Sequence, residues 1–267
     1  MKQRPGFPAR LDKDKASSPP KTLLGATRVL TAQSPMRPKP VAMPSPAGVG
    51  LDSSTVRVRM VQKLADQGMT DTLVLQAMGL IERHRFVDSA LVNQAYEDTS
   101  LPIGLGQTIS KPNVVARMMA LVRQAPGLQA DGLMGRVLEI GTGCGYQAAL
   151  LSHIAREVYS IERLRGLHDK ARENLRPLRL PNVHLIFGDG MLGYPQGAPY
   201  SAIIAAAGGE DIPRAWLDQL AMGGRIVAPM QTSQGQQALV VIDKTAQGLQ
   251  QTLLEAVHFV PLKSGIA

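Results

Sequence analysis

Apolar residues follow two different spacings along this chain. Val56, Met60, Val61 and Leu64 recur at the spacing of one helix face, and Gly68 is suited to end that helix. The same spacing predicts further helices from residue 71 onward. Together the helices are expected over residues 56–68, 71–83, 112–124, 146–154, 164–175 and 212–220.

Short apolar runs alternate with the later helices and indicate strands. We expect strands at 136–140, 157–161, 183–187, 200–205, 224–229 and 237–243, with a last extended run at 256–262. Regular alternation of strand and helix predicts an α/β fold: a doubly wound, mostly parallel, Rossmann-like sheet with helices on both faces and an N-terminal helical extension. The last strands have no helix between them, so a late hairpin is expected.

Residues 1–53 differ in composition from the rest of the chain. They hold nine of its 19 prolines and show no sustained apolar periodicity. Such a segment buries too little apolar surface to offset its ordering entropy, so we interpret it as a disordered basic tail. Residues 54–267 are then one domain, with an N-terminal helical part and loop at 54–125 and a ligand-binding part at 126–267.

Charge and composition narrow the classes of function. The net charge is +8, but residues 1–50 carry nine Lys or Arg and two Asp, which leaves the rest at +1. The folded part therefore lacks the basic footprint of a nucleic-acid binder. No apolar run reaches the roughly 18 residues of a membrane helix. Cys144, as a single cysteine, suits a reducing, cytoplasmic location and a packing role, and the five scattered histidines indicate no metal site.

The most informative stretch is the apolar run 137–140 followed by Gly141, Gly143 and Gly145 and then a predicted helix. A strand that enters a glycine turn and then a helix is where α/β sheets bind nucleotide-like ligands. The dinucleotide fingerprint has a different glycine spacing and serves a pyrophosphate.

Two acids define the ligand further. Glu139 lies inside the strand before the glycine turn, where it would repel a pyrophosphate. Glu162 ends the next strand, 21 residues after Gly141, the offset at which an acid accepts hydrogen bonds from ribose hydroxyls. An adenosine ligand without phosphates, S-adenosylmethionine, fits best. The alternative is a structural turn with a solvated Glu162.

Several segments resemble the protein-L-isoaspartate O-methyltransferase family over roughly residues 56–263. They are Glu82–Val87, Leu101–Pro112, Val137–Tyr146, Gly188–Gly190, Met222–Val227 and His258–Leu262. The most specific of them is Gln107-Thr-Ile-Ser110 before a proline. The resemblance implies methyl transfer from S-adenosylmethionine to the free carboxylate of L-isoaspartyl residues in damaged proteins, which initiates their repair.

The resemblance also implies roles for individual residues. Ser110 is carried over as catalytic, with a hydroxyl that holds the substrate carboxylate; the local pattern alone would favour a helix N-cap. Asp189 is carried over to the adenine, against the alternative of a β-turn. The expected substrate contacts are Thr108, Ile109, Ser110 and Gln237, and the expected cofactor contacts are Glu139, Gly141, Thr142, Gly143, Gly145, Tyr146, Glu162, Arg163, Asp189 and Gly190.

One loop departs from the family pattern and keeps other functions open. Glu210 and Asp211 lie in a segment, 206–213, that is apolar in relatives and borders their substrate. A methyltransferase of the same fold that acts on another carboxylate or a small molecule is therefore one alternative. A nucleic-acid-associated protein that works through its basic tail is another. We expect isoaspartyl proteins as partners, no membrane and a monomer.

Overall fold

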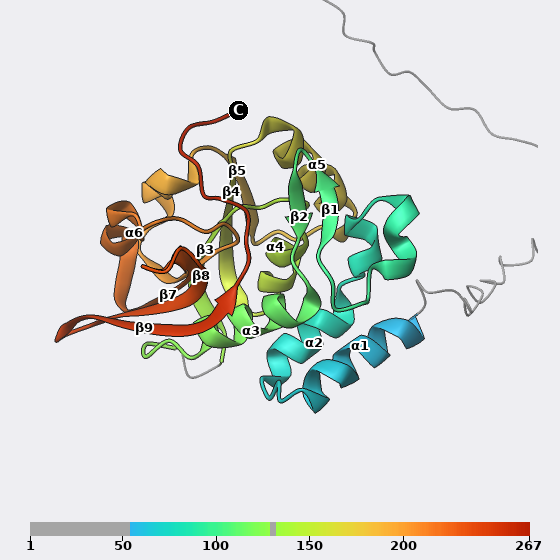
Figure 1. Cartoon of the computed structure of the whole chain (residues 1–267), viewed down its shortest axis with the longest axis horizontal. Coiled ribbons are helices and arrows are strands. Elements are labelled where there is room, and N and C mark those ends of the chain that lie inside the picture. The colour runs from blue at the N-terminus through green and yellow to red at the C-terminus, as the bar shows by residue number, and fades with distance from the viewer. Residues whose placement is uncertain (1–53, 129–131) are drawn as a thin grey trace, which may run out of the picture. The chain divides into compact units, whose positions relative to one another are not determined.

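The computed structural model describes residues 54–128 and 132–267. Its main sheet has seven strands in the order β5-β4-β3-β6-β7-β8-β9 (Figure 1). The pairs among β5, β4, β3, β6 and β7 are all parallel. The strand bounds are β3 Met134–Ile140, β4 Ala155–Glu162, β5 Val183–Phe187, β6 Tyr200–Ala205, β7 Leu220–Gln231, β8 Gln237–Thr245 and β9 Gly248–Val257.

The strand order creates a switch point beside β3. The chain runs from β3 outward through β4 to β5 and then returns to place β6 on the other side of β3. The connections that follow β3 and β6 therefore leave the sheet in opposite directions, which opens a crevice at the strands' carboxyl ends. This is where the glycine turn lies, so the topology places the predicted ligand site at the usual position for such sheets.

Helices cover both faces of the sheet, which confirms the predicted fold class. Val137 packs in the core under α1 to α4, whereas its neighbour Leu138 packs in a second core with Trp216 of α6. Successive strand residues thus point to opposite faces. Among the described residues, no helix has the length and apolar character needed to cross a membrane. The helices are α1 Ser54–Asp66, α2 Thr72–Leu80, α3 Pro112–Arg123, α4 Tyr146–Leu151, α5 Arg165–Leu175 and α6 Arg214–Gln219.

The expected late hairpin is present, but the last strand lies earlier in the sequence than the expected run at 256–262. β7, β8 and β9 form an antiparallel meander. β9 covers 248–257 instead of 256–262, and residues 258–262 leave the sheet except for a bridge between Pro261 and Gly208. β9 is an edge strand exposed over most of its length, so its sequence carries no buried apolar run; pairing with β8 makes it a strand.

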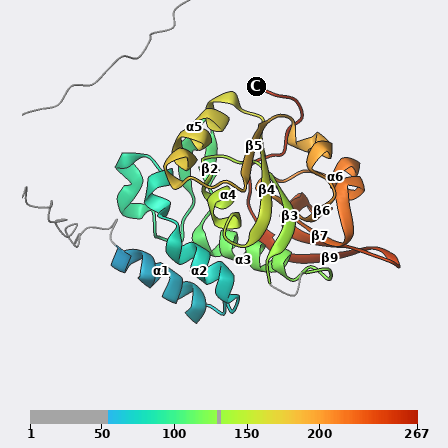
Figure 2. The ribbon, with the colours of Figure 1, turned by 180° about the vertical axis from the view of Figure 1, so that it is seen from behind.

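The N-terminal part forms a helical layer and a small hairpin, seen from behind in Figure 2. The helix predicted over 71–83 ends at Leu80, and the chain continues as the 3₁₀ helices η1 (Arg83–Phe86) and η2 (Ser89–Gln94). The predicted loop at 102–110 contains a two-stranded antiparallel hairpin, β1 (Leu101–Gly104) and β2 (Gln107–Ile109). This hairpin leads directly into α3.

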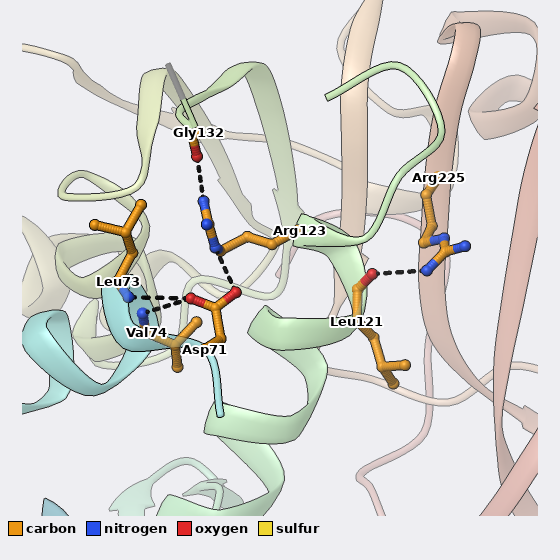
Figure 3. Close-up of polar contacts among 7 residues, drawn as sticks. All are labelled: Asp71, Leu73, Val74, Leu121, Arg123, Gly132 and Arg225. Atoms are coloured by element: carbon orange, nitrogen blue, oxygen red, sulfur yellow. Dashed lines mark hydrogen bonds and ion pairs between the residues drawn. The ribbon is translucent and has the colours of Figure 1, made fainter. Parts of the chain in front are cut away.

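Polar contacts fix α3 between the helical layer and the sheet (Figure 3). Asp71 caps α2 by accepting from the backbone N–H groups of Leu73 and Val74, and its second oxygen pairs with Arg123 at 2.6 Å. Arg225 of β7 donates to the carbonyl of Leu121 at 3.0 Å. The side chains of Asp71, Arg123 and Arg225 are largely buried, so these contacts give α3 a defined position.

Candidate functional site

The glycine turn between β3 and α4 has a backbone that only glycine adopts without strain. Gly141, Gly143 and Gly145 have φ of 89°, 57° and 90°. A Cβ atom on Gly143 would lie 3.1 Å from Ile103 Cδ1 in β1. The turn therefore needs glycine for its conformation and for the close approach of the β1–β2 hairpin.

Glu162, at the end of β4, holds the glycine turn from the neighbouring strand. Its two carboxylate oxygens each accept one backbone N–H, from Gly143 and from Leu164, both at 2.9 Å. The residue is 5% exposed. Each oxygen keeps a lone pair, so a fixed carboxylate at the strand end still accepts hydrogen bonds from two adjacent hydroxyl groups.

Glu139 lies on β3 beside Ser160 of β4, away from solvent. Its carboxyl accepts from Ser160 Oγ at 2.5 Å, and Ser160 Oγ is 2.6 Å from Thr142 Oγ1. Complete burial raises the pKa of Glu139 to about 8, with the nearby Glu162 adding to the rise, so the carboxyl is mostly protonated at neutral pH. Glu139 and Thr142 therefore form a buried network that supports the turn from behind.

A cavity of about 410 Å³ opens in front of the turn. This volume suits a small-molecule ligand. Its wall includes six of the residues that the sequence proposed: Thr108, Gly141, Gly143, Glu162, Arg163 and Gly190. Glu139, Thr142, Gly145 and Tyr146 are not among the residues that line it, and all four are buried.

Ser110 lies in a neighbouring cavity of about 560 Å³ instead of the one that holds Glu162. The segment 258–262 borders both, with His258 and Phe259 on the Ser110 side. Ser110 is also not the N-cap of α3. That position belongs to Lys111, and Asp98 Oδ1 accepts from the backbone of Asn113 at 2.8 Å. The helix start is thus satisfied without the Ser110 hydroxyl.

Asp189 follows β5 and is held by backbone donors on both oxygens. Oδ1 accepts from Met191 N at 2.8 Å, a local turn contact of the kind named above as the alternative for this residue, and Oδ2 accepts from Gly265 N at 2.6 Å. The C-terminal segment 263–267 continues past Arg163, whose carbonyl accepts from Ala267 N at 2.8 Å. This segment therefore runs beside the loops that follow β4 and β5 (Figure 1).

Two expected substrate contacts have structural duties. Ile109 is 5% exposed and packs in the core. Gln237 forms two hydrogen bonds with the backbone of Phe259, at 3.2 and 2.7 Å, and so attaches the segment 258–262 to β8. Gln237 also lines a third cavity, of about 810 Å³, together with Glu210 and Asp211.

Sequence reasoning missed part of the cavity wall. Leu164 and Leu167 line it from the start of α5, and an apolar residue two positions after the strand-end acid was a usable signal. Lys263 lines it from the far end of the chain, where no local pattern indicates a site. Trp216 is 1% exposed and donates to the carbonyl of Gly190 at 2.8 Å.

Neither metal nor thiol chemistry is indicated in the part of the chain that the structure describes. No group of three or more His, Cys, Asp or Glu residues has metal-binding geometry there. Cys144 is buried, and its burial raises the pKa of the thiol, which agrees with the packing role expected for it.

The family model described as protein-L-isoaspartate(D-aspartate) O-methyltransferase matches residues 55–267. The chain belongs to this family. A methyltransferase of that name from Methylibium petroleiphilum is 57% identical over 98% of this chain and 96% of its own length. One from Leptothrix cholodnii is 61% identical over 82% of this chain and 77% of its own.

Solved structures agree with this assignment. A protein-L-isoaspartate O-methyltransferase that is 29% identical superposes with a TM-score of 0.70, over 79% of this methyltransferase and 67% of the other chain. A Plasmodium falciparum protein of the same description, solved with S-adenosyl-L-homocysteine, is 22% identical. It has a TM-score of 0.66 over 78% of this chain and 98% of its own, which shows the shared fold.

Proposed function

We propose that this methyltransferase transfers a methyl group from S-adenosylmethionine to the free carboxylate of L-isoaspartyl residues in damaged proteins. The observation that carries the proposal is the cavity in front of the glycine turn. Its wall holds the fixed carboxylate of Glu162 and also Gln107 and Thr108 of the hairpin, which begin the Gln107-Thr-Ile-Ser110 motif. Both lie inside the region that matches the family.

The residues of the cavity fit an adenosine group. Glu162 offers two oriented acceptors for a pair of ribose hydroxyls, and Leu164 and Leu167 offer apolar surface for a base. Asp189, held by Met191 and Gly265, is the proposed partner of the adenine amine at the rim. Glu139 and Thr142 act on the cofactor indirectly, because they support the turn from behind.

The chemistry asks little of the protein's own groups. The cofactor, when bound, supplies an activated sulfonium methyl group. A substrate carboxylate is already ionised at neutral pH, so its oxygen forms the new bond to carbon while the carbon–sulfur pair departs with sulfur, and no base is needed. The protein must align the two reactants, and alignment is a large part of the barrier reduction available to enzymes.

Ser110 is the proposed catalytic residue. Its hydroxyl is not the cap of α3 and faces the cavity that adjoins the cofactor cavity across the segment 258–262. A neutral donor holds a carboxylate oxygen without the strong pairing of a cation. The substrate therefore enters on the Ser110 side, with its carboxylate directed past Phe259 toward the methyl group.

One observation favours an altered substrate preference. Glu210 and Asp211 are exposed and border the cavity of about 810 Å³ next to Gln237. These two acids would repel a substrate with acidic residues next to its isoaspartyl position. They also favour the alternative of a methyltransferase that acts on a different carboxylate. The nucleic-acid alternative depends on the basic tail, which lies outside the described residues, as does the disorder expected for it.

Labelled methyl transfer to paired peptides tests the function. An isoaspartyl peptide and its normal aspartyl counterpart differ only in which carboxylate is free. Transfer to the isoaspartyl peptide alone supports the proposal, and equal transfer to both or to neither refutes it. Deleting residues 1–50 should leave the rate unchanged, and light scattering on the same sample tests the predicted monomer.

A further inference from the structure

Arg83 is a buried cation at the centre of the N-terminal part. It begins η1 and is 0% exposed. Nε donates to the carbonyl of Ala95 at 2.7 Å, and Nη2 donates to the carbonyl of Ser110 at 2.8 Å. The guanidinium carbon lies 5.0 Å from the centre of the Tyr146 ring, within range of a cation–π contact.

Stability alone does not account for this arginine. Within residues 54–128 and 132–267, no ion pair involves Arg83, and its Nη1 has no hydrogen-bond acceptor. Burial lowers the pKa of Arg83, as expected for a cation removed from water. Removing a cation from water without a paired anion costs free energy. What the arginine provides is its contacts.

These contacts join the two halves of the site. Ser110 directly follows β2 of the β1–β2 hairpin, and Tyr146 directly follows Gly145, the last glycine of the glycine turn. One planar side chain fixes the carbonyl of the first and covers the ring of the second. Phe86, three residues after Arg83, packs edge-on against Tyr146 with ring centres 5.4 Å apart. The short helix η1 therefore contacts Tyr146, at the end of the glycine turn, through both Arg83 and Phe86.

Fixing the Ser110 carbonyl also restricts its hydroxyl. The carbonyl belongs to the peptide unit between Ser110 and Lys111, and Lys111 is the N-cap of α3. With this peptide plane held, the Cα atom of Ser110, from which the side chain projects, has a fixed position relative to the glycine turn. A planar guanidinium holds such a direction better than an ammonium, because its donors are fixed in one plane.

We propose that Arg83 is a positioning residue for methyl transfer, which sets Ser110 at the correct distance from the cofactor turn. This inference rests on the proposed function. It predicts that loss of the guanidinium reduces turnover while cofactor binding persists. Arg83→Met, neutral and of similar length, should lower kcat on the isoaspartyl peptide by at least about tenfold, since small misplacements of reacting groups have large effects on rate.

The matched control is Arg85→Met, in the same short helix, where the side chain is 44% exposed and pairs with Glu82. It should keep turnover within about twofold. Affinity for S-adenosylhomocysteine, measured by calorimetry, should change by less than about threefold in both variants. A purely structural arginine would instead lower the melting temperature, and turnover and cofactor affinity would fall together. If Arg83→Met does not fold, Arg83→Lys supports the same comparison.

A double-mutant cycle with Ser110→Ala decides the question. If Arg83 acts through Ser110, adding Arg83→Met to Ser110→Ala should reduce turnover by less than about twofold. Reductions that multiply to the full product of the two single changes would overturn the inference. Absence of transfer by the wild-type protein would count against the proposed function instead, so the two failures are distinguishable.

Discussion

Glu139→Gln tests whether the buried carboxyl behind the glycine turn is neutral. The side chain is 0% exposed and accepts a hydrogen bond from Ser160. Burial raises the pKa from an ordinary 4.5 to about 8, so the folded chain binds this proton more tightly than the unfolded chain does. The stability contributed by this group is therefore fully present below pH 4.5 and is lost as the pH rises toward 8.

The size of the effect follows from the two pKa values. Between about pH 5 and pH 7, ionisation of Glu139 in the unfolded chain alone should lower the free energy of unfolding by roughly 2 kcal/mol. Glutamine has a similar shape and does not titrate. The stability of Glu139→Gln relative to wild type should therefore increase by this amount over the same interval.

Urea unfolding at several pH values measures the difference, with Trp216 as the fluorescent probe because it is the single tryptophan and 1% exposed. Glu173→Gln, an exposed carboxyl on α5, controls for the loss of one negative charge. A difference between Glu139→Gln and wild type that stays constant with pH would refute the reasoning. Affinity for S-adenosylhomocysteine should stay within about threefold of wild type, since Glu139 does not line the cavity.

Four further changes have defined outcomes. Ser110→Ala should lower turnover at least about tenfold without lowering the melting temperature, because its hydroxyl does not cap α3. Glu162→Ala should weaken S-adenosylhomocysteine binding by roughly 1.5 to 3 kcal/mol in calorimetry. Deleting residues 265–267 removes the hydrogen bond from Gly265 N to Asp189, so it should weaken S-adenosylhomocysteine binding by less than Glu162→Ala does. Asp71→Ala should lower the free energy of unfolding by roughly 2 to 4 kcal/mol in urea, since a helix cap and a largely buried ion pair are lost together.

The part of the fold that sequence predicts well is the part with local signals. β5 and β6 have the predicted bounds, because each is an apolar run between polar turns. Gly141, Gly143 and Gly145 have a backbone conformation that other residues rarely adopt, so the spacing of these glycines after an apolar run predicted the turn. The position of Glu162 in the site could be predicted because its distance in sequence from the turn is the length of one strand–helix–strand unit.

The remaining features depend on contacts between distant residues. β9 is a strand because β8 is beside it, and its own exposed sequence does not alternate. The local pattern favoured Ser110 as a cap, but Asp98 satisfies the α3 terminus from 15 residues away. Lys263 reaches the cavity because Gln237 and the backbone of Gly208 hold the segment 258–262 beside the sheet. β9 directly follows β8 in the chain, whereas Asp98 and Asn113 are 15 residues apart and Gln237 and Phe259 are 22 apart, and the local apolar pattern reveals none of these contacts.

Two buried polar groups lie at the two ends of the glycine turn, and removing each from water has a desolvation cost. Glu139 precedes the turn and is linked to it through Ser160 and Thr142; Arg83 contacts Tyr146, which follows the turn. An apolar core would need neither. Three consecutive alternate glycines leave a backbone with unusual freedom, so the local sequence does not fix its shape. Directional contacts at each end supply the missing constraint, which accounts for a buried, mostly protonated carboxyl and a buried guanidinium beside the turn.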